Sequence, residues 1–282
     1  MSDKESIIDY IIEQVSKINY DFIVDAHCHI ESDAYSEEER EEAIKRAIEK
    51  RIMMFSTPLT QRERERALML REKYHPWIKV VTGSHPLFNE DVDRVINWIL
   101  ENSDKIIAIG EVGLDFTPPY NKPEIMKSQI DKFKRFIDLA KELDKPLVIH
   151  SRAAGRQTIE VLIREGAERV LLHAFSGKAK YALKGIEAGF YFSIPPSVAF
   201  SPQKKKLVKA LPLDNIMLET DSPIFSPKRG ENSEPLYVLF SAAVISSIKE
   251  VDIKEVLNVT TRNAIKLFRI SSPSKSTPRY TS

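Results

Sequence analysis

The sequence predicts an α/β fold in which eight parallel strands and their helices close into a (β/α)8 barrel. Short apolar runs alternate with longer stretches of helical periodicity over almost the whole 282-residue chain. This alternation is typical of a parallel sheet with helices packed outside it. Histidines and carboxylates also follow the apolar runs repeatedly. In this fold, also called the TIM barrel, active-site groups gather at the carboxyl ends of the strands.

The first half of the chain is predicted to contain four strand–helix pairs. A helix at 36–50 follows a strand at 21–27, because Ser36 is a good N-cap and the acidic residues after it suit the helix dipole. Residues 123–143 have apolar side chains at helical spacing and Pro123 near the start, which favours a long amphipathic helix. Between these lie strands at 52–56, before His85 and before Glu111, and helices at 60–73 and 91–102.

The second half continues the alternation and completes a barrel domain at 21–270. Strands precede His150, His173 and Asp221 and cover 189–194, and helices cover 155–165, 178–188, 202–210 and 235–269. Residues 1–20 have isoleucines at the spacing of an amphipathic helix. We expect this N-terminal helical extension to pack against the outside of the barrel; the alternative is a helix that binds a partner. Residues 271–282 are rich in Ser, Pro and Thr and are predicted to form a flexible tail.

The composition is typical of a protein with one large hydrophobic core and no disulfide framework. A hydrophobic content of 42% is enough for one large core, and a single cysteine excludes an intramolecular disulfide framework. The sequence shows no secretory signal and no apolar run of membrane-spanning length, so we expect a cytoplasmic protein with no membrane association.

The charge balance bears on the substrate. The net charge of +1, from 42 basic and 41 acidic residues, argues against extensive non-specific binding of duplex DNA. We interpret the basic clusters as solvated helix faces; they are Arg62, Arg64 and Arg66, Lys178, Lys180 and Lys184, and Lys204 to Lys206. A short phosphate-bearing substrate held in one pocket remains compatible with this balance.

A metal site is predicted from the residues that end the strands. Side chains of a strand alternate between its faces, so His27 and His29 point the same way, and two adjacent imidazoles are half of a metal site. The other candidates at strand ends are His85, Glu111, His150, His173 and Asp221. Three further residues have other interpretations: His75 lies in a loop, Cys28 packs outward as a small apolar group, and Glu219 supports the site from a deeper position.

The motifs at these strand ends resemble the TatD family of metal-dependent deoxyribonucleases, within the amidohydrolase-like barrels. The matching segments span about 21–268 in the family's order: Asp25 to His29, Gly83 to Pro86, Gly110 to Asp115, Pro146 to Arg152, His173 to Gly177, Glu219 to Pro223, and Thr261 to Ala264. The resemblance implies two divalent metal ions. His27, His29 and Asp221 would hold one ion, Glu111 would bridge to the second, and His150 and His173 would complete it.

The resemblance also implies roles in catalysis and substrate binding. Two divalent ions can activate water and hold a phosphate oxygen together. Glu111 would set their separation, and Asp221 is the predicted group that orients the water and accepts its proton. The predicted substrate contacts are His85, Asp115, Arg152, Ser176 and Arg229, the last in the loop 227–235. Ligand chemistry does not decide between Zn²⁺, Mg²⁺ and Mn²⁺.

Three functions follow from this site. The preferred one is a nuclease that cuts DNA phosphodiesters at strand ends or damaged sites, with DNA ends or short nucleic acid as substrate. The second keeps the metal site but acts on a small ester, lactone or aminoacyl ester. It is favoured by the weak global basicity and by the stretch from Ser151 to Arg156, which lacks the acidic residue and histidine common in the family. Phe116, which stands where a tyrosine is frequent, is a further departure from the family pattern. The third is a non-catalytic binding barrel, favoured only by the extra N-terminal helix.

Overall fold

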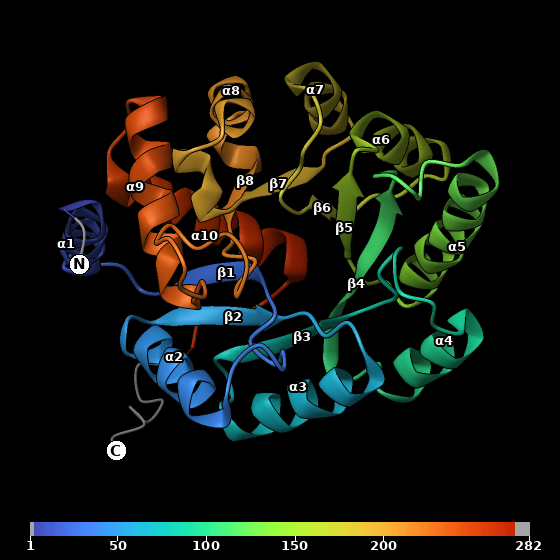
Figure 1. Cartoon of the computed structure of the whole chain (residues 1–282), viewed down its shortest axis with the longest axis horizontal. Helices are drawn as coiled ribbons and strands as arrows, with labels where there is room; N and C mark the ends of the chain where they lie inside the picture. Colours follow the sequence, from blue (N-terminus) through green and yellow to red (C-terminus); the bar gives the residue numbers. More distant parts are fainter. Residues whose placement is uncertain (1–2, 274–282) are drawn as a thin grey trace.

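The computed structural model of the chain describes residues 3–273 and contains one sheet of eight strands in the order β1 to β8. All neighbouring strands pair in parallel, and the helices surround the sheet (Figure 1). The strands are β1 (Ile23–Cys28), β2 (Ile52–Ser56), β3 (Ile78–Thr82), β4 (Ile106–Asp115), β5 (Leu147–Arg152), β6 (Val170–Leu172), β7 (Tyr191–Ile194) and β8 (Ile216–Leu218). The predicted (β/α)8 fold class is confirmed.

The helices follow the predicted alternation. They are α1 (Asp3–Ser16), α2 (Glu37–Glu49), α3 (Gln61–Lys73), α4 (Val92–Glu101), α5 (Pro123–Glu142), α6 (Gly155–Arg164), α7 (Ala179–Glu187), α8 (Pro202–Ala210), α9 (Val238–Lys249) and α10 (Ile253–Phe268). Ser36 caps α2 as expected, in a reciprocal capping box with Glu39. Thr60 and Glu63 form the same arrangement at the start of α3.

Several boundaries differ from the predictions by two or three residues, since β3 ends at Thr82, β5 continues to Arg152 and β8 ends at Leu218. Two differences are larger. Strand β4 does not end at Glu111 but continues to Asp115, which brings Asp115 alongside the end of β5. The predicted single helical region at 235–269 is two helices, because Glu250 takes the left-handed conformation (φ 56°) and Asp252 caps a new helix.

The N-terminal helix packs on the outside of the barrel. Ile8, Ile12 and Val15 of α1 are buried, and α1 lies beside α9 (Figure 1). Lys228, in the loop after β8, forms an ion pair with Asp9 of α1 at 2.7 Å. The division into an extension, a barrel domain and a tail stays a prediction, and most of the predicted tail, 274–282, lies outside the described residues.

The close approach of strands β4 and β5 at one glycine helps to position the polar residues at the ends of these strands. Gly113 of β4 pairs with His150 of β5 and has φ 142°, a conformation that side-chain-bearing residues rarely adopt. A Cβ atom at this position would lie 2.1 Å from the carbonyl oxygen of His150. Only glycine therefore lets the two strands run this close where Glu111 and His150 meet.

The barrel closes between its first and last strands. The closing contacts are backbone hydrogen bonds between the residues at and just after the end of β1 and the residues that follow β8. The Asp221 N–H donates to the His27 carbonyl at 2.9 Å, and the His29 N–H donates to the Ser222 carbonyl at 2.7 Å. None of the helices among residues 3–273 combines the length and the apolar character needed to cross a membrane.

Candidate metal centre

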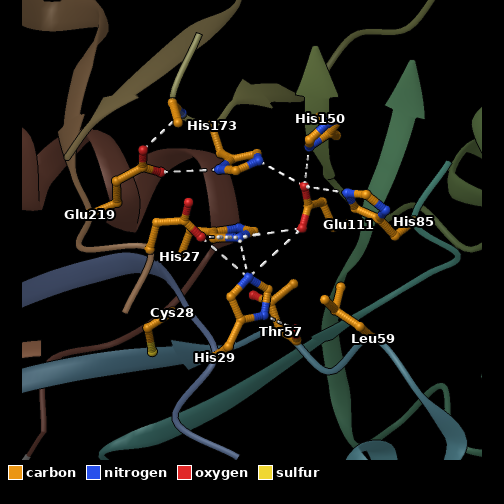
Figure 2. Close-up of polar contacts among 12 residues, drawn as sticks. His27, Cys28, His29, Thr57, Leu59, His85, Glu111, His150, His173 and Glu219 are labelled. Atoms are coloured by element: carbon orange, nitrogen blue, oxygen red, sulfur yellow. Dashed lines mark hydrogen bonds and ion pairs between the residues drawn. The ribbon is translucent and has the colours of Figure 1, made fainter. Parts of the chain in front are cut away.

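Glu111 lies at the centre of the polar cluster and faces histidines with both carboxylate oxygens (Figure 2). Its Oε1 atom lies 2.5 Å from His150 Nδ1 and 2.8 Å from His173 Nε2. Its Oε2 atom lies 3.6 Å from His27 Nε2 and 3.9 Å from His29 Nε2. Each oxygen of one buried carboxylate thus faces its own pair of histidines, an arrangement that allows a carboxylate to bridge two cations. The pairs adjoin one another, because the rings of His27 and His173 stack with their centres 3.9 Å apart.

Asp221 completes the group around His27 and His29. Its Oδ1 atom lies 3.2 Å from His29 Nε2 and 3.5 Å from His27 Nε2, and the two histidine nitrogens lie 3.3 Å apart. Among the described residues, Asp221 Oδ1 is buried without a hydrogen-bond partner. Two ring nitrogens and an orphaned carboxylate oxygen that meet in a buried space need a shared positive charge.

The spacing of these atoms suits a metal ion. Ligands about 2.0–2.1 Å from a zinc ion lie roughly 3.4 Å from one another at tetrahedral angles. Among the Nε2 atoms of His27 and His29, Glu111 Oε2 and Asp221 Oδ1, every pair that includes a histidine nitrogen is separated by 3.2–3.9 Å. The nitrogen and oxygen donors present therefore fit a divalent cation, and histidine with carboxylate is a donor set that Zn²⁺ and Mn²⁺ accept.

Outer contacts fix how the histidine rings are turned. His29 Nδ1 lies 2.6 Å from the Thr57 carbonyl, so this nitrogen carries the proton and Nε2 keeps its lone pair for the cluster. His150 Nε2 lies 3.0 Å from Asp115 Oδ2, which leaves Nδ1 toward Glu111. Such contacts raise ligand basicity and hold ring orientation in metal sites.

Asp115 is itself held by α5. Gln129 accepts a hydrogen bond from the Asp115 N–H at 2.8 Å and donates to the Asp115 carbonyl at 2.9 Å. A single amide side chain thus fixes both backbone groups of the residue that orients His150. Gln129 could not be identified from the sequence, since a glutamine on a long amphipathic helix carries no local signal.

Glu219 supports the site from below, as the sequence analysis predicts. It is fully buried and accepts hydrogen bonds from the Ala174 N–H at 2.8 Å and from the Ser193 hydroxyl at 2.5 Å. Its Oε2 atom lies 3.8 Å from His173 Nδ1. Burial raises the pKa of Glu219 to about 7. The contact with Ala174 fixes the chain directly after His173.

The shifted pKa values in the cluster indicate that its buried carboxylates are stabilised by nearby positive charge. Burial opposes the charge on Glu111, but the neighbouring histidines, His173 foremost, hold its pKa well below the usual range. Burial likewise opposes protonation of His150, yet Glu111 and Asp115 raise its pKa to about 9. His27 differs, because burial and the adjacent His173 hold its pKa well below normal. Protons on some of the histidines therefore supply part of the positive charge that a cation would bring.

A cavity of about 580 Å³ opens over the cluster. The cavity is lined by six of the seven candidates at strand ends, which are His29, His85, Glu111, His150, His173 and Asp221. The seventh, His27, is fully buried and does not line the cavity. Of the predicted substrate contacts, Asp115, Arg152 and Ser176 also line this cavity. Arg229 is exposed and is not among the lining residues. His75 is exposed, in keeping with its exclusion from the site.

One lining residue corrects an interpretation made from the sequence. Lys204 belongs to a run of three lysines that we interpreted as a solvated face, and for Lys204 this is wrong. Its side chain lines the cavity and the residue is only 8% exposed, whereas Lys205 and Lys206 are exposed. The burial depends on how α8 packs against the loop after β6, which the local sequence does not show.

A family model described as "TatD related DNase" matches residues 24–269. The chain belongs to the TatD family. It is similar to the deoxyribonuclease TATDN3 of Homo sapiens, with 39% identity over 259 residues, covering 87% of this chain and 94% of the human protein. It is also similar to the uncharacterized metal-dependent hydrolase MJ1582 of Methanocaldococcus jannaschii, with 36% identity over 250 residues, 87% of this chain and 96% of the relative.

Solved structures of TatD proteins share the fold. The crystal structure of YJJV, a TatD homolog from Escherichia coli, superimposes with a TM-score of 0.81 at 23% identity and covers 88% of this chain and 98% of the other. With the family, the relatives and the cluster of histidines and carboxylates taken together, this chain is a TatD-type metal-dependent hydrolase.

The departures from the TatD pattern noted in the sequence lie at the cavity and beside it. Ser151 and Arg152, in the stretch that lacks the acidic residue and histidine common in the TatD family, both line the cavity. Phe116 is buried, and its N–H donates to the Arg152 carbonyl at 3.0 Å. The ligand candidates are thus all present, and the altered positions lie where a substrate would contact the protein.

Proposed function

We propose that this TatD-type hydrolase cleaves phosphodiester bonds of DNA, at strand ends or in short single strands, with two divalent ions held by the candidate ligands. The main support for the proposal is the placement of Glu111, whose two oxygens face two different pairs of histidines. His27, His29 and Asp221 would hold one ion and His150 and His173 the other, with Glu111 between them. Divalent ions in such a pair supply positive charge to a phosphate and lower the pKa of water.

Asp221 is the residue we assign to the proton transfer. It lines the cavity, so that its carboxylate can contact a water molecule there. Although burial opposes its charge, the contact with His29 and the charges of the neighbouring histidines lower the pKa of Asp221, so this carboxylate is ionised at neutral pH. An ionised carboxylate beside the reacting centre can orient water and accept its proton.

The surroundings of the cavity favour a phosphate-bearing polymer over a neutral molecule. Arg152 ends β5, Arg156 lies at the start of α6, and Lys178 and Lys180 lie at the start of α7. Residues 151–159 and 174–186 include no acidic residue. All four basic side chains are exposed or partly exposed at the end of the barrel where the cavity opens. Such a basic rim can contact the phosphates of a strand that extends beyond the site.

The apolar side chains that line the cavity suit a nucleobase. Leu59, Leu87, Ile224 and Phe225 line it together with the polar cluster. Bases bind proteins largely by stacking and apolar contact, and these contacts tolerate different sequences. The names of the relatives, among them a deoxyribonuclease in human, support the same substrate class.

The second candidate is hydrolysis of a small ester, lactone or aminoacyl ester. The observation that favours it is the altered stretch at Ser151 and Arg152, which changes the wall of the cavity while leaving the ligand candidates in place. The non-catalytic barrel is not supported, since all of the candidate ligands are present. The cytoplasmic location stays a prediction from the sequence.

Reconstitution of metal-depleted protein separates these functions. Samples loaded with Zn²⁺, Mg²⁺ or Mn²⁺ are incubated with end-labelled single-stranded DNA, with a duplex that contains an abasic site, and with a panel of small esters and lactones. We expect shortened DNA products and two metal equivalents per chain by elemental analysis. Hydrolysis of the esters without any cleavage of either DNA would overturn the proposal, and a single metal equivalent at full activity would overturn its two-metal part.

A further inference from the structure

A buried lysine lies in the cavity and has no role in the site described so far. Lys204 is in the first turn of α8, and its Nζ atom donates a hydrogen bond to the Ala174 carbonyl at 2.9 Å. The ammonium also lies 5.5 Å from the ring centre of Phe225. Ala174 directly follows His173, so Lys204 stands on the wall of the cavity that carries that ligand candidate.

The surroundings do not satisfy this ammonium. A lysine has three N–H donors, and among the described residues the Ala174 carbonyl is the one hydrogen-bond acceptor recorded for Lys204. Burial lowers its pKa, while the charges of Glu219 and Asp221 act in the opposite direction without forming a hydrogen bond. Burying a cation without an ion-pair partner is costly, so such a residue persists where an anion can bind.

The neighbouring basic residues differ from Lys204 in burial. Arg152 also lines the cavity, but its side chain is exposed. Lys205 and Lys206 follow Lys204 on the same helix turn and are exposed. The helix start is fixed as well, because Gln203 Nε2 donates to the Gly177 carbonyl at 2.7 Å. The chain therefore holds one buried ammonium in a set position at the cavity.

We propose that Lys204 is the phosphate-binding residue of the cavity, and that its ε-ammonium binds a non-bridging oxygen of the substrate phosphate on the wall formed by β6, β8 and α8. The inference rests on the proposed function for the identity of the anion as a phosphodiester. It adds that recognition of the anion depends on this chain's own cation as well as on bound metal. Lys204 thereby favours phosphate substrates over neutral esters.

A purely structural role is the main competing explanation. Lys204 could serve only to hold the Ala174 carbonyl and, through it, His173. Loss of the ammonium would then weaken metal binding and slow every substrate equally. A binding role predicts a selective effect on anions at unchanged metal content, so the two roles differ in the substrates affected.

The test compares K204M, K204R and the exposed neighbour K206M at equal metal content, verified by elemental analysis. The dissociation constant of inorganic phosphate is measured by titration calorimetry. KM and kcat are measured for bis(p-nitrophenyl) phosphate and for the neutral p-nitrophenyl acetate. We expect K204M to raise the phosphate dissociation constant and the phosphodiester KM by about tenfold or more, in line with loss of a charged hydrogen bond. K204R should recover part of the loss, and K206M should remain within about twofold of the unaltered protein.

The outcomes separate this inference from the proposed function. An unchanged phosphate dissociation constant in K204M, or an equal loss on the phosphate and acetate substrates, overturns the role of Lys204. If the unaltered protein cleaves neither DNA nor the phosphodiester but its phosphate affinity still depends on Lys204, the proposed function fails and the anion site stands.

Discussion

The buried carboxylate of Asp25 accepts two hydrogen bonds from Thr220, one from its N–H at 2.9 Å and one from its hydroxyl at 2.5 Å. Asp25 belongs to β1, and Thr220 follows β8. The contact therefore joins the first strand of the barrel to the chain after the last. The contact also lies beside two ligand candidates, because His27 is two residues after Asp25 and Asp221 directly follows Thr220.

Replacing Thr220 by valine should loosen this junction. T220V keeps the side-chain shape but removes the hydroxyl, which leaves an oxygen of Asp25 buried with one donor fewer. We expect a loss of about 1–3 kcal/mol in the free energy of unfolding, measured by urea denaturation, together with weaker metal binding. T220S, which keeps the hydroxyl, is the matched control. Equal stability of T220V and the unaltered protein would show that the hydroxyl contributes nothing.

Glu111→Gln tests the carboxylate between the two histidine groups. The amide has nearly the same size but no charge, so it cannot neutralise two cations. We expect the variant to bind at least one metal equivalent less by elemental analysis and to lose hydrolytic activity by at least a hundredfold, about 2.7 kcal/mol or more in transition-state stabilisation. E160Q, on the exposed surface of α6, is the control and should behave as the unaltered protein. Full metal content in E111Q would contradict the bridging role.

Gln129→Met tests an outer support of the site. Methionine fits the same space but cannot hold the N–H and carbonyl of Asp115, so Asp115 should orient His150 less well. Loss of such supporting contacts typically weakens metal affinity by about 10–100-fold, and we expect a change in this range. The measurement is a competition titration with a metal chelator. S128A, at the exposed neighbouring position, should leave the affinity unchanged.

Metal binding should release protons at neutral pH. Glu111 and Asp115 raise the pKa of His150 to about 9, so this histidine is protonated below that pH when no metal is bound. A cation must displace the proton, and apparent affinity should therefore rise with pH up to about 9 and fall in acid. Calorimetric titrations in buffers of different ionisation enthalpy count the protons released. Binding that is independent of pH between 6 and 9 would contradict the protonated state of His150.

The basic rim should add affinity for long substrates. Removing two cations in R152Q/K178Q should weaken binding of a single-stranded oligonucleotide. It should also reduce the slope of log affinity against log salt by roughly 1.4, about 0.7 for each phosphate contact. Fluorescence anisotropy at several salt concentrations measures both effects. K45Q, near the end of α2 and thus at the opposite end of the barrel, serves as the control. An unchanged salt slope would exclude the rim from substrate binding.

Much of the fold and of the candidate centre could be predicted because both depend on local regularities. Strand periodicity put His27 and His29 on one face, and the repeated placement of polar residues after apolar runs predicted a shared end of the barrel. Contacts between distant segments could not be predicted in this way. The burial of Lys204 depends on how α8 packs. The partner of His29 is the backbone carbonyl of Thr57, and because every residue has such a carbonyl, the sequence does not indicate this contact.

The part of the chain that follows the last strand shows both cases. The break between α9 and α10 had a local signal, since Asp252 is a good N-cap and accepts a hydrogen bond from the Lys254 N–H. Arg229 had no comparable signal. Its loop lies near the candidate centre in sequence, but the direction of an exposed loop side chain depends on contacts such as the ion pair between Lys228 and Asp9.

The closure between β1 and β8 has a consequence for how the protein matures. A chain that has left the ribosome only as far as the residue after β6 already carries His27, His29, Glu111, His150 and His173, but not Asp221. Until β8 has been synthesised, the sheet stays open, and the first pair of histidines lacks its carboxylate partner. Loading of the ion assigned to His27, His29 and Asp221 is therefore expected to follow synthesis of nearly the whole polypeptide, so a truncated translation product should lack this ion.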